Sequence, residues 1–217
     1  MIRIGIVDDH VLFRESLNLL INNFQDMEVV LEASNGNELL EKLKTNSINI
    51  LLLDLQMPEM DGFETSIKVK ELFPDIKILI LTFSTELDTI RKIMQMDVQG
   101  YFTKNTSPDE LEKAIRRLDK NGFYFEKKLS SVIEKIMNTL ASNENSMIVF
   151  SDREMEIIYL TLKEYNGMEI AEKLSISPRT VEVHKRNLME KTGSKNFMGV
   201  VVYALLHKLI SLNDLNQ

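Results

Sequence analysis

Three aspartates, a threonine and a lysine each follow a short apolar run of the sequence, and together they could form one polar site. They are Asp8, Asp9, Asp54, Thr82 and Lys104. Carboxylates that converge repel one another unless a cation joins them, and oxygen ligands without His or Cys suit Mg²⁺. Asp54 could then attack phosphorus to form an acyl phosphate, while the metal, Lys104 and the Thr82 hydroxyl stabilise the transferred oxygens. These residue types therefore indicate phosphoryl-transfer chemistry.

The elements that must position these residues alternate regularly along the first half of the chain. Short apolar runs, typical of strands buried on both faces, alternate with amphipathic helical patterns. The predicted strands are Ile2–Val7, Val29–Ala33, Ile48–Leu53, Ile76–Leu81 and Gly100–Thr103. Five strands alternating with five helices predict a doubly wound α/β domain with a parallel sheet. Ligands of such sheets bind outside the carboxyl ends of the strands, so the polar residues are expected to converge there.

Each of these residues also has a structural alternative. A single acidic residue after a strand is more often a helix cap or a solvated turn residue than a reactive group. That alternative applies to Asp54 taken alone. It weakens for the whole set, because five residues suited to one reaction end four predicted strands. The acidic pocket is therefore the favoured interpretation.

Composition excludes several other classes of protein. The 217 residues contain no cysteine, which rules out disulfides and thiolate-ligated metals. The apolar stretches are far shorter than the roughly 20 residues of a membrane span, and the N-terminus lacks the apolar core of a signal peptide. A cytoplasmic protein without a membrane partner is expected. The formal charge of -7 lies entirely in residues 1–146, because residues 147–217 carry nine basic and nine acidic residues. This asymmetry suggests two modules with different partners.

Beyond Gly122 the pattern changes to helices alone. Residues 122–147 are expected to form a linker, with a short helix over Lys128–Leu140 and a polar run at 142–146. Residues 148–217 are predicted to form a small all-α domain of four helices. Their starts are indicated by capping signals or apolar periodicity at Ser151, Asn166, Ser177 and Phe197.

The second and third of these helices are joined by the tight turn Ser175–Ser177, as in a helix-turn-helix. Val181 and Leu188 of the third helix are expected to face inward. Its cations could contact phosphates while other side chains read base edges in the major groove of DNA. The candidate DNA contacts are Arg179, Thr180, Glu182, Val183, His184, Lys185, Arg186 and Lys191. The structural alternative is a solvated charged face, which is the commoner meaning of any single Lys/Arg cluster.

Four segments resemble the signature segments of response-regulator receiver domains. They are Ile6–His10, Leu53–Gly62, Leu81–Thr82 and Gly100–Lys104, and the resemblance covers residues 1–121. It implies a flavodoxin-like fold in which a sensor histidine kinase phosphorylates Asp54. It further implies that Mg²⁺ is held by Asp9, Asp54 and the backbone carbonyl of Gln56, with Asp8 acting through water. Thr82 and Tyr101 match the switch pair of this family.

Residues 150–206 resemble the LuxR-type helix-turn-helix of response regulators of the NarL/FixJ class. The resemblance is carried by Phe150–Glu154, Glu169–Ala171, Ser177–His184 and Lys191–Asn196. It implies a recognition helix over Pro178–Lys191 that binds a double-stranded DNA operator. It also implies a homodimer formed on activation, with Val200, Val201 and Ala204 of the last helix available as contacts.

Four residues depart from these family patterns. Phe83 stands where receivers often have a small residue, and could shield an acyl phosphate from water or small phosphodonors. Asn105 replaces a frequent proline, so a cis peptide there would cost more. In the helix-turn-helix, Glu164 replaces a usual glycine and Glu182 a frequent lysine. A glutamate cannot pair with phosphate but can accept a hydrogen bond from cytosine, so an unusual operator or weak nonspecific affinity is expected.

These features predict a transcriptional regulator activated by phosphorylation of Asp54. Two alternatives remain at this stage. The chain could bind DNA independently of phosphorylation and use the receiver as a dimer platform, which the intact acidic pocket disfavours. It could instead be an enzyme that transfers phosphate from an exogenous substrate through Asp54, but no second general acid and no substrate lid are evident. Self-modification of Asp54 is not turnover, so the expectation is that the chain is not an enzyme.

Overall fold

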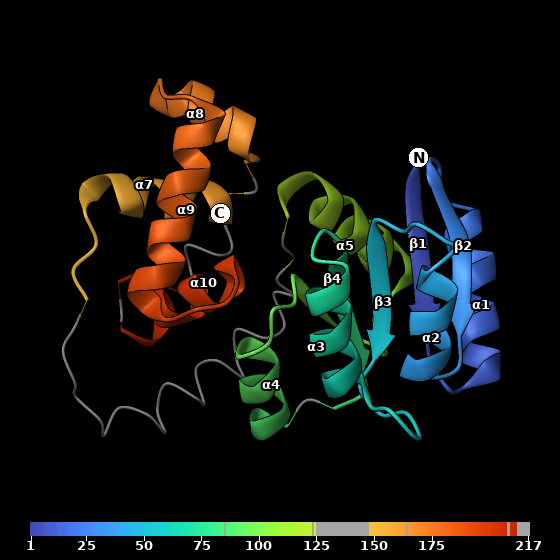
Figure 1. Ribbon diagram of the computed structural model, residues 1–217. Coiled ribbons are helices and arrows are strands. Elements are labelled where there is room, and N and C mark those ends of the chain that lie inside the picture. The colour runs from blue at the N-terminus through green and yellow to red at the C-terminus, as the bar shows by residue number, and fades with distance from the viewer. Residues whose placement is uncertain (85, 123, 125–147, 164, 208, 212–217) are drawn as a thin grey trace. The chain divides into compact units, whose positions relative to one another are not determined.

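The computed structural model describes the whole chain except residues 85, 123, 125–147, 164, 208 and 212–217 (Figure 1). The predicted linker, its helix over residues 128–140 and Glu164 therefore lie outside the described residues. The chain folds into two compact units. One contains Met1–Ser84 with Met96–Tyr124, and the other contains Thr85–Gln95 with Phe125–Gln217.

The first unit is built on a parallel five-stranded sheet with the order β2-β1-β3-β4-β5. The strand order reverses between β1 and β3, which defines the doubly wound, flavodoxin-like topology and confirms the predicted α/β fold. The strands are β1 (Ile2–Val7), β2 (Met27–Ala33), β3 (Ile50–Asp54), β4 (Lys77–Thr82) and β5 (Gly100–Thr103).

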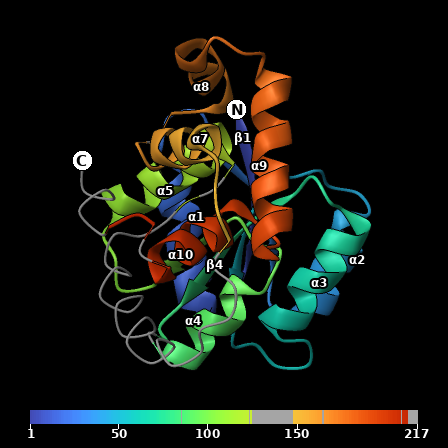
Figure 2. The same cartoon turned by 90° about the vertical axis from the view of Figure 1, so that its left-hand side faces the viewer.

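Helices cover both faces of this sheet. They are α1 (Val11–Asn22), α2 (Gly36–Leu43), α3 (Gly62–Leu72) and α5 (Pro108–Asn121), while α4 (Leu87–Met94) is grouped with the second unit. One apolar cluster joins α1 and α5 to alternate residues of the strands, including Ile6, Leu52, Leu81 and Phe102. Figure 2 shows α2 and α3 side by side, and they contact each other. Since both faces are covered, the central strands β3 and β4 are apolar except at their ends.

The strands end one residue later than the hydrophobic pattern predicted at two decisive places. Both Asp54 and Thr82 are paired residues of their strands, opposite Leu81 and Thr103 respectively. Hydrogen bonding of the ladder fixes these ends, whereas a hydrophobicity pattern stops at the first polar residue. As a result both functional side chains are held by regular sheet backbone rather than by a loop.

The second unit contains the four predicted helices of the C-terminal domain: α7 (Asp152–Leu162), α8 (Gly167–Leu174), α9 (Pro178–Thr192) and α10 (Phe197–Leu206). Capping boxes begin α7 and α8, as predicted: in each, the N-cap side chain accepts from the third helical residue and the glutamate there accepts from the N-cap backbone. Ser177 caps α9, which has proline in its first turn. Helix α10 ends at Leu206.

Helices α8 and α9 are joined by a turn in which Ser175 adopts a left-handed conformation with φ of 53°. The N–H of Ile176 donates to the carbonyl of Ala171 and so closes the end of α8. Val181 and Leu188 of α9 are fully buried, as predicted. Val200, Val201 and Ala204 are also fully buried. The expectation that these three residues are available as dimer contacts is therefore wrong for this conformation, because they pack inside the chain.

No described helix combines the length and the apolar character that crossing a membrane requires.

Candidate functional site

The predicted polar residues converge at the carboxyl edge of the sheet. The ammonium of Lys104 lies 2.7 Å from Oδ2 of Asp8 and 2.8 Å from Oδ2 of Asp54. All three side chains are nearly inaccessible: 1% of that of Lys104, none of that of Asp8 and 4% of that of Asp54 is exposed. Desolvation offsets much of the attraction within such a buried cluster, but losing one partner leaves an uncompensated buried charge and is strongly destabilising.

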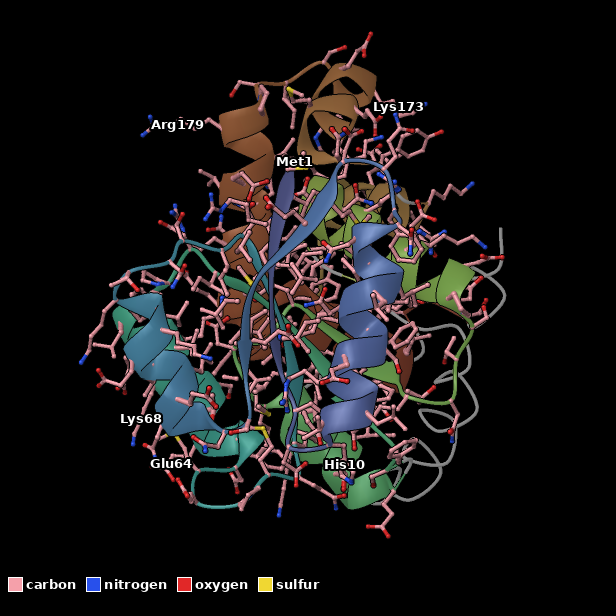
Figure 3. All side chains as sticks on the ribbon, turned by 90° about the vertical axis from the view of Figure 1, so that its right-hand side faces the viewer. Met1, His10, Glu64, Lys68, Lys173 and Arg179 are labelled. Carbon is pink, nitrogen blue, oxygen red and sulfur yellow. The ribbon has the colours of Figure 1, made fainter. Side chains whose placement is uncertain are left out.

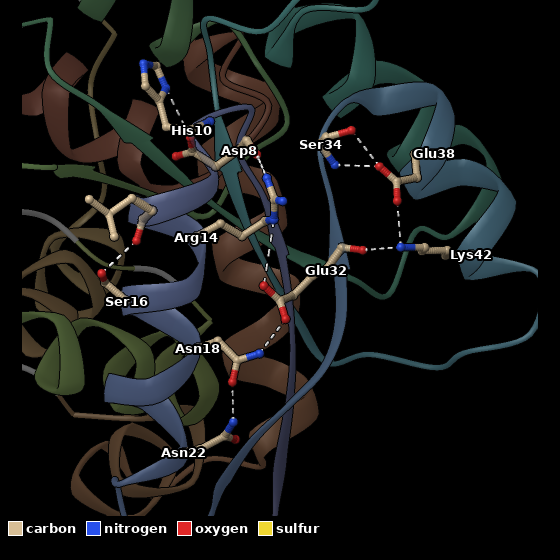
Figure 4. A network of polar contacts seen from close by, with 11 residues as sticks. Asp8, His10, Arg14, Ser16, Asn18, Asn22, Glu32, Ser34, Glu38 and Lys42 are labelled. Atoms are coloured by element: carbon tan, nitrogen blue, oxygen red, sulfur yellow. Dashed lines mark hydrogen bonds and ion pairs between the residues drawn. The ribbon is translucent and has the colours of Figure 1, made fainter.

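The backbone between β1 and α1 holds Asp8 and Asp9 in place. The N–H of His10 donates to Oδ1 of Asp8 at 2.9 Å, and the guanidinium of Arg14 donates to the Asp8 carbonyl. Arg14 also pairs with Glu32 of β2, at 3.7 Å (Figure 4). Figure 3 shows His10 at the opposite end of this unit from Met1, as expected for the carboxyl end of β1.

Asp54 ends β3, and Gln56 follows it closely. Burial raises the pKa of Asp54, while the hydrogen bond and charge of Lys104 and the backbone N–H of Gln56 act against that rise without cancelling it. The backbone of Gln56 therefore lies beside the Asp54 carboxyl. A close approach of Gly62 keeps this loop tight, since a Cβ on Gly62 would lie 2.1 Å from the carbonyl oxygen of Asp54.

The donor set fits a hard divalent cation. One ligand atom from each of Asp8, Asp9, His10 and Asp54 lies within 4.8 Å of the others. Oδ2 of Asp8 and Oδ1 of Asp9 are buried and accept no hydrogen bond of good geometry from the described residues, although Lys104 and His10 lie close to them. Two such carboxylate oxygens beside a third carboxylate are the ligands that Mg²⁺ prefers.

Thr82 and Tyr101 are linked through the backbone of Ser84. The N–H of Ser84 donates to the Thr82 hydroxyl at 3.1 Å, and the Tyr101 hydroxyl donates to the Ser84 carbonyl at 2.7 Å. Tyr101 is 2% exposed, so its ring occupies the inward position in this structure. The two residues of the predicted switch pair therefore both contact the backbone of one residue.

Helix α9 presents a mixed outer face. Arg179, Glu182 and Arg186 are exposed, whereas Thr180, Val183 and His184 are half-buried. Figure 3 shows Arg179 pointing away from the body of its unit. The candidate contacts therefore lie on one helix, with cations on both sides of a glutamate along its exposed face.

Two cations of α9 have partners inside the domain. Lys185 is 8% exposed, and its ammonium lies 5.5 Å from the ring centroid of Phe197 and 3.9 Å from a carboxylate oxygen of Glu182. Burial lowers the pKa of Lys185, with Glu182 acting against this. Lys191 pairs with Glu154 of α7 at 2.7 Å. Both lysines were predicted as DNA contacts; in this structure Lys185 is buried, whereas Lys191 stays exposed while it pairs with Glu154.

Several residues of the site were not predicted from the sequence. Arg14 and Phe13 lie on α1, a helix whose pattern indicated only its buried face. Glu154 was predicted as a cap but also holds Lys191. Only tertiary contacts give these residues their second role, so the local pattern holds no signal for them.

The fold and the site define a receiver domain followed by a DNA-binding domain. Residues 4–116 match the family described as response regulator receiver domain, and residues 148–204 match the bacterial regulatory proteins of the luxR family. The chain therefore belongs to the response regulators of two-component systems, in the NarL class with a LuxR-type helix-turn-helix that binds DNA and regulates transcription.

Relatives match the chain over nearly its whole length. The oxygen regulatory protein NreC of Staphylococcus carnosus is 35% identical over 96% of this chain and 99% of its own, and NreC of Staphylococcus aureus is 36% identical over the same shares. Among solved structures, the response regulator RcsB of Salmonella typhimurium is similar with a TM-score of 0.60 at 26% identity, covering 93% of this chain and 97% of that one. An RcsB–DNA complex gives 0.59 at 25% identity, covering 93% and 96%.

Proposed function

We propose that this chain is a transcription regulator whose DNA binding is switched by phosphorylation of Asp54. A sensor histidine kinase would be the phosphate donor, and the cytoplasm the compartment in which kinase and DNA meet the chain. The observation that carries the proposal is the Asp54 carboxylate, held 2.8 Å from the buried ammonium of Lys104 at the carboxyl edge of the sheet.

The residues of the pocket have distinct parts in this proposal. One Asp54 oxygen attacks phosphorus, the bond from phosphorus to the donor's nitrogen breaks, and an acyl phosphate forms. Lys104 then exchanges its contact with the Asp54 carboxylate for one with a phosphoryl oxygen. The Thr82 hydroxyl donates to another. Because the ammonium is already desolvated and fixed, it requires little reorganisation to stabilise the transferred charge.

Mg²⁺ would be held by Asp9, Asp54 and the Gln56 carbonyl, with Asp8 acting through water. When bound, it supplies positive charge that neutralises the phosphoryl oxygens during transfer. Oδ2 of Asp8 and Oδ1 of Asp9 support this assignment, because they are buried and accept no hydrogen bond of good geometry from the described residues.

The backbone of Ser84 connects the two residues of the proposed switch, Thr82 and Tyr101. A Thr82 hydroxyl that turns toward the phosphoryl group gives up the hydrogen bond from the Ser84 N–H. The loop after β4 is then released on one side, while Tyr101 still holds its carbonyl. We infer that this loop carries the phosphorylation signal to a surface that promotes a homodimer. Paired recognition helices would then bind two half-sites of an operator.

For the DNA contacts we retain the predicted residues of α9, but we distinguish those that can reach DNA in this structure from those that first have to leave an intramolecular partner. The exposed Arg179 and Arg186 are favoured for phosphate contacts, and Thr180, Glu182, Val183 and His184 for base edges. Lys185 and Lys191 would have to leave Phe197 and Glu154 before they could reach phosphate.

Two alternatives are weighed against this function. Phosphorylation-independent DNA binding would leave the buried Lys104–Asp54 pair without a purpose, and we disfavour it for that reason. Turnover of an exogenous phosphorylated substrate lacks a general acid beside Asp54 among the described residues. We therefore propose no enzymatic activity beyond self-modification.

The test is phosphorylation of the full chain by acetyl phosphate with Mg²⁺, followed by intact-protein mass spectrometry. We expect one phosphoryl group on the native chain and none on Asp54→Asn. Glu59→Gln, an exposed acidic residue of the same loop, is the matched control and should be phosphorylated like the native chain. Equal incorporation in Asp54→Asn would contradict the proposal.

A further inference from the structure

Two aromatic rings lie against the ammonium of Lys104, on segments that follow two different strands. The ring centroid of Phe13, in α1, lies 4.8 Å from the lysine nitrogen, and that of Phe83, directly after β4, lies 5.3 Å away. The rings also contact each other, with centroids 6.4 Å apart and planes inclined by 54°. One cation therefore has two carboxylates and two aromatic rings as its neighbours.

The backbone explains why the rings meet here. The N–H of Lys104 donates to the carbonyl of Thr82 at 3.0 Å, so the end of β5 is fixed beside the residue that precedes Phe83. Phe13 lies in the first turn of α1, directly after the loop that carries Asp8 and Asp9. The rings and the carboxylates are thus held by the same strand ends.

The exposures of these residues define an enclosed site with an exposed outer wall. Only 4% of the Asp54 side chain and 1% of the Lys104 side chain are exposed, whereas Phe83 is 54% exposed. A nucleophile that must reach phosphorus is therefore closed off from solvent. The large ring at its border has solvent on one side and no dense packing to hold it.

A cavity beside Phe13 leaves that ring room to move. It has a volume of about 170 Å³ and is lined mainly by apolar side chains, among them Leu17, Leu81 and Phe102, with the stem of Lys104 at its edge. The pocket is partly open to solvent, so the inner ring can shift into it without displacing core residues.

We propose that Phe13 and Phe83 form an aromatic cover over Lys104 that controls access of water and small phosphodonors to Asp54. The proposal rests on phosphorylation of Asp54, the function proposed above. In hydrolysis, a water oxygen attacks phosphorus, the bond between phosphorus and the Asp54 oxygen breaks, and inorganic phosphate leaves while the carboxylate is restored. The cover slows this step because it keeps water from the side of the pocket that Lys104 occupies. It also disfavours small phosphodonors relative to a protein donor, because a small molecule has no protein surface that could displace the rings.

The test measures both directions of transfer on the full chain with Mg²⁺: the rate of phosphorylation by acetyl phosphate, and the half-life of the acyl phosphate after the donor is removed. Phe83→Ala should increase both rates by about 2- to 5-fold, a barrier reduction of about 0.4–1 kcal/mol, because the outer ring no longer restricts access to the pocket. Phe83→Leu, which keeps most of the volume, should stay closer to the native chain. Leu72→Ala, which removes a similarly exposed apolar side chain from α3, is the matched control.

The outcomes distinguish failure of the aromatic cover from failure of the proposed phosphorylation of Asp54. Native and Phe83→Ala chains that are phosphorylated and dephosphorylated at equal rates would overturn the cover and leave the phosphorylation of Asp54 intact. Faster phosphorylation and faster dephosphorylation of Phe83→Ala than of the native chain would support the cover. If neither chain accepts phosphate, both proposals fail. Phe13→Leu provides a second variant of the cover that retains an apolar residue against the core and should act in the same direction as Phe83→Ala.

Discussion

At the scale of single residues, the pocket depends on one buried cation. Lys104 pairs with both Asp8 and Asp54, and all three side chains are almost completely removed from water. Charges in such surroundings are tolerated only when they are paired, because desolvation is expensive. The lysine is therefore a structural counterion as well as the proposed partner for phosphate.

This dual role predicts a loss of stability when the lysine is removed. Lys104→Ala should lower the free energy of unfolding of the receiver by about 3 kcal/mol in a chelating buffer, since two buried carboxylates lose their counterion. Added Mg²⁺ should restore a large part of that loss, because a bound cation neutralises the same carboxylates. Urea unfolding of the full chain, monitored through spectroscopic signals of the receiver domain, measures both effects.

Lys113→Ala provides the control, because Lys113 pairs with Glu110 on the surface of α5. Its cost should be small, because the pair is exposed to solvent, and it should not respond to Mg²⁺. A Lys104→Ala chain as stable as the native one would show that the buried pair contributes nothing.

At the scale of helices and strands, features that depend on local sequence were predicted well, whereas features that depend on tertiary contacts were not. The caps at Ser151, Asn166 and Ser177 all appear where the sequence predicted them, because a cap depends on residues three positions apart. The ends of β3 and β4 were placed one residue early, since register with a neighbouring strand decides them. The burial of Lys185 depends on Phe197 of the next helix, which no helical period within α9 reveals.

Glu154 takes part in both a local and a tertiary interaction. It completes the capping box of α7 and also binds Lys191 near the end of α9. Burial raises the pKa of this carboxyl, but the hydrogen bonds from Lys191 and Ser151 outweigh burial and hold the pKa below the usual 4.5. The contact is thus strongest when Glu154 is ionised.

The sign of this shift predicts how acid affects the C-terminal domain. Because the folded pKa is depressed, the stabilisation is fully present above pH 4.5 and is lost as the pH falls through the folded pKa. Glu154→Gln should cost about 0.5–1 kcal/mol at pH 7 and progressively less in acid. Unfolding of the full chain in urea at several pH values, followed by amide signals of α7 and α9, measures the difference. Glu190→Gln, an exposed residue of α9, is the control; a constant gap between native and Glu154→Gln chains would contradict the assignment.

At the scale of the whole molecule, the charged residues are distributed unequally between the two parts of the chain. The acidic excess lies in residues 1–146, where carboxylates build the pocket, and residues 147–217 are balanced. The fold of both parts and the phosphoacceptor pocket could be predicted from the sequence, because strand ends of a doubly wound sheet meet at one edge. The contact of Phe13 with Lys104 and the burial of Val200, Val201 and Ala204 could not, because they depend on side-chain packing between distant segments.

The central claim is that a phosphoryl group on Asp54 changes the assembly of this chain. Light scattering of the full chain with Mg²⁺, with and without beryllofluoride as a mimic of the acyl phosphate, tests it most directly. We predict a shift from monomer to dimer for the native chain and no shift for Asp54→Asn. Beryllofluoride that binds, as fluorine NMR would register, without any change of mass would contradict the claim, as would an equal shift in Asp54→Asn.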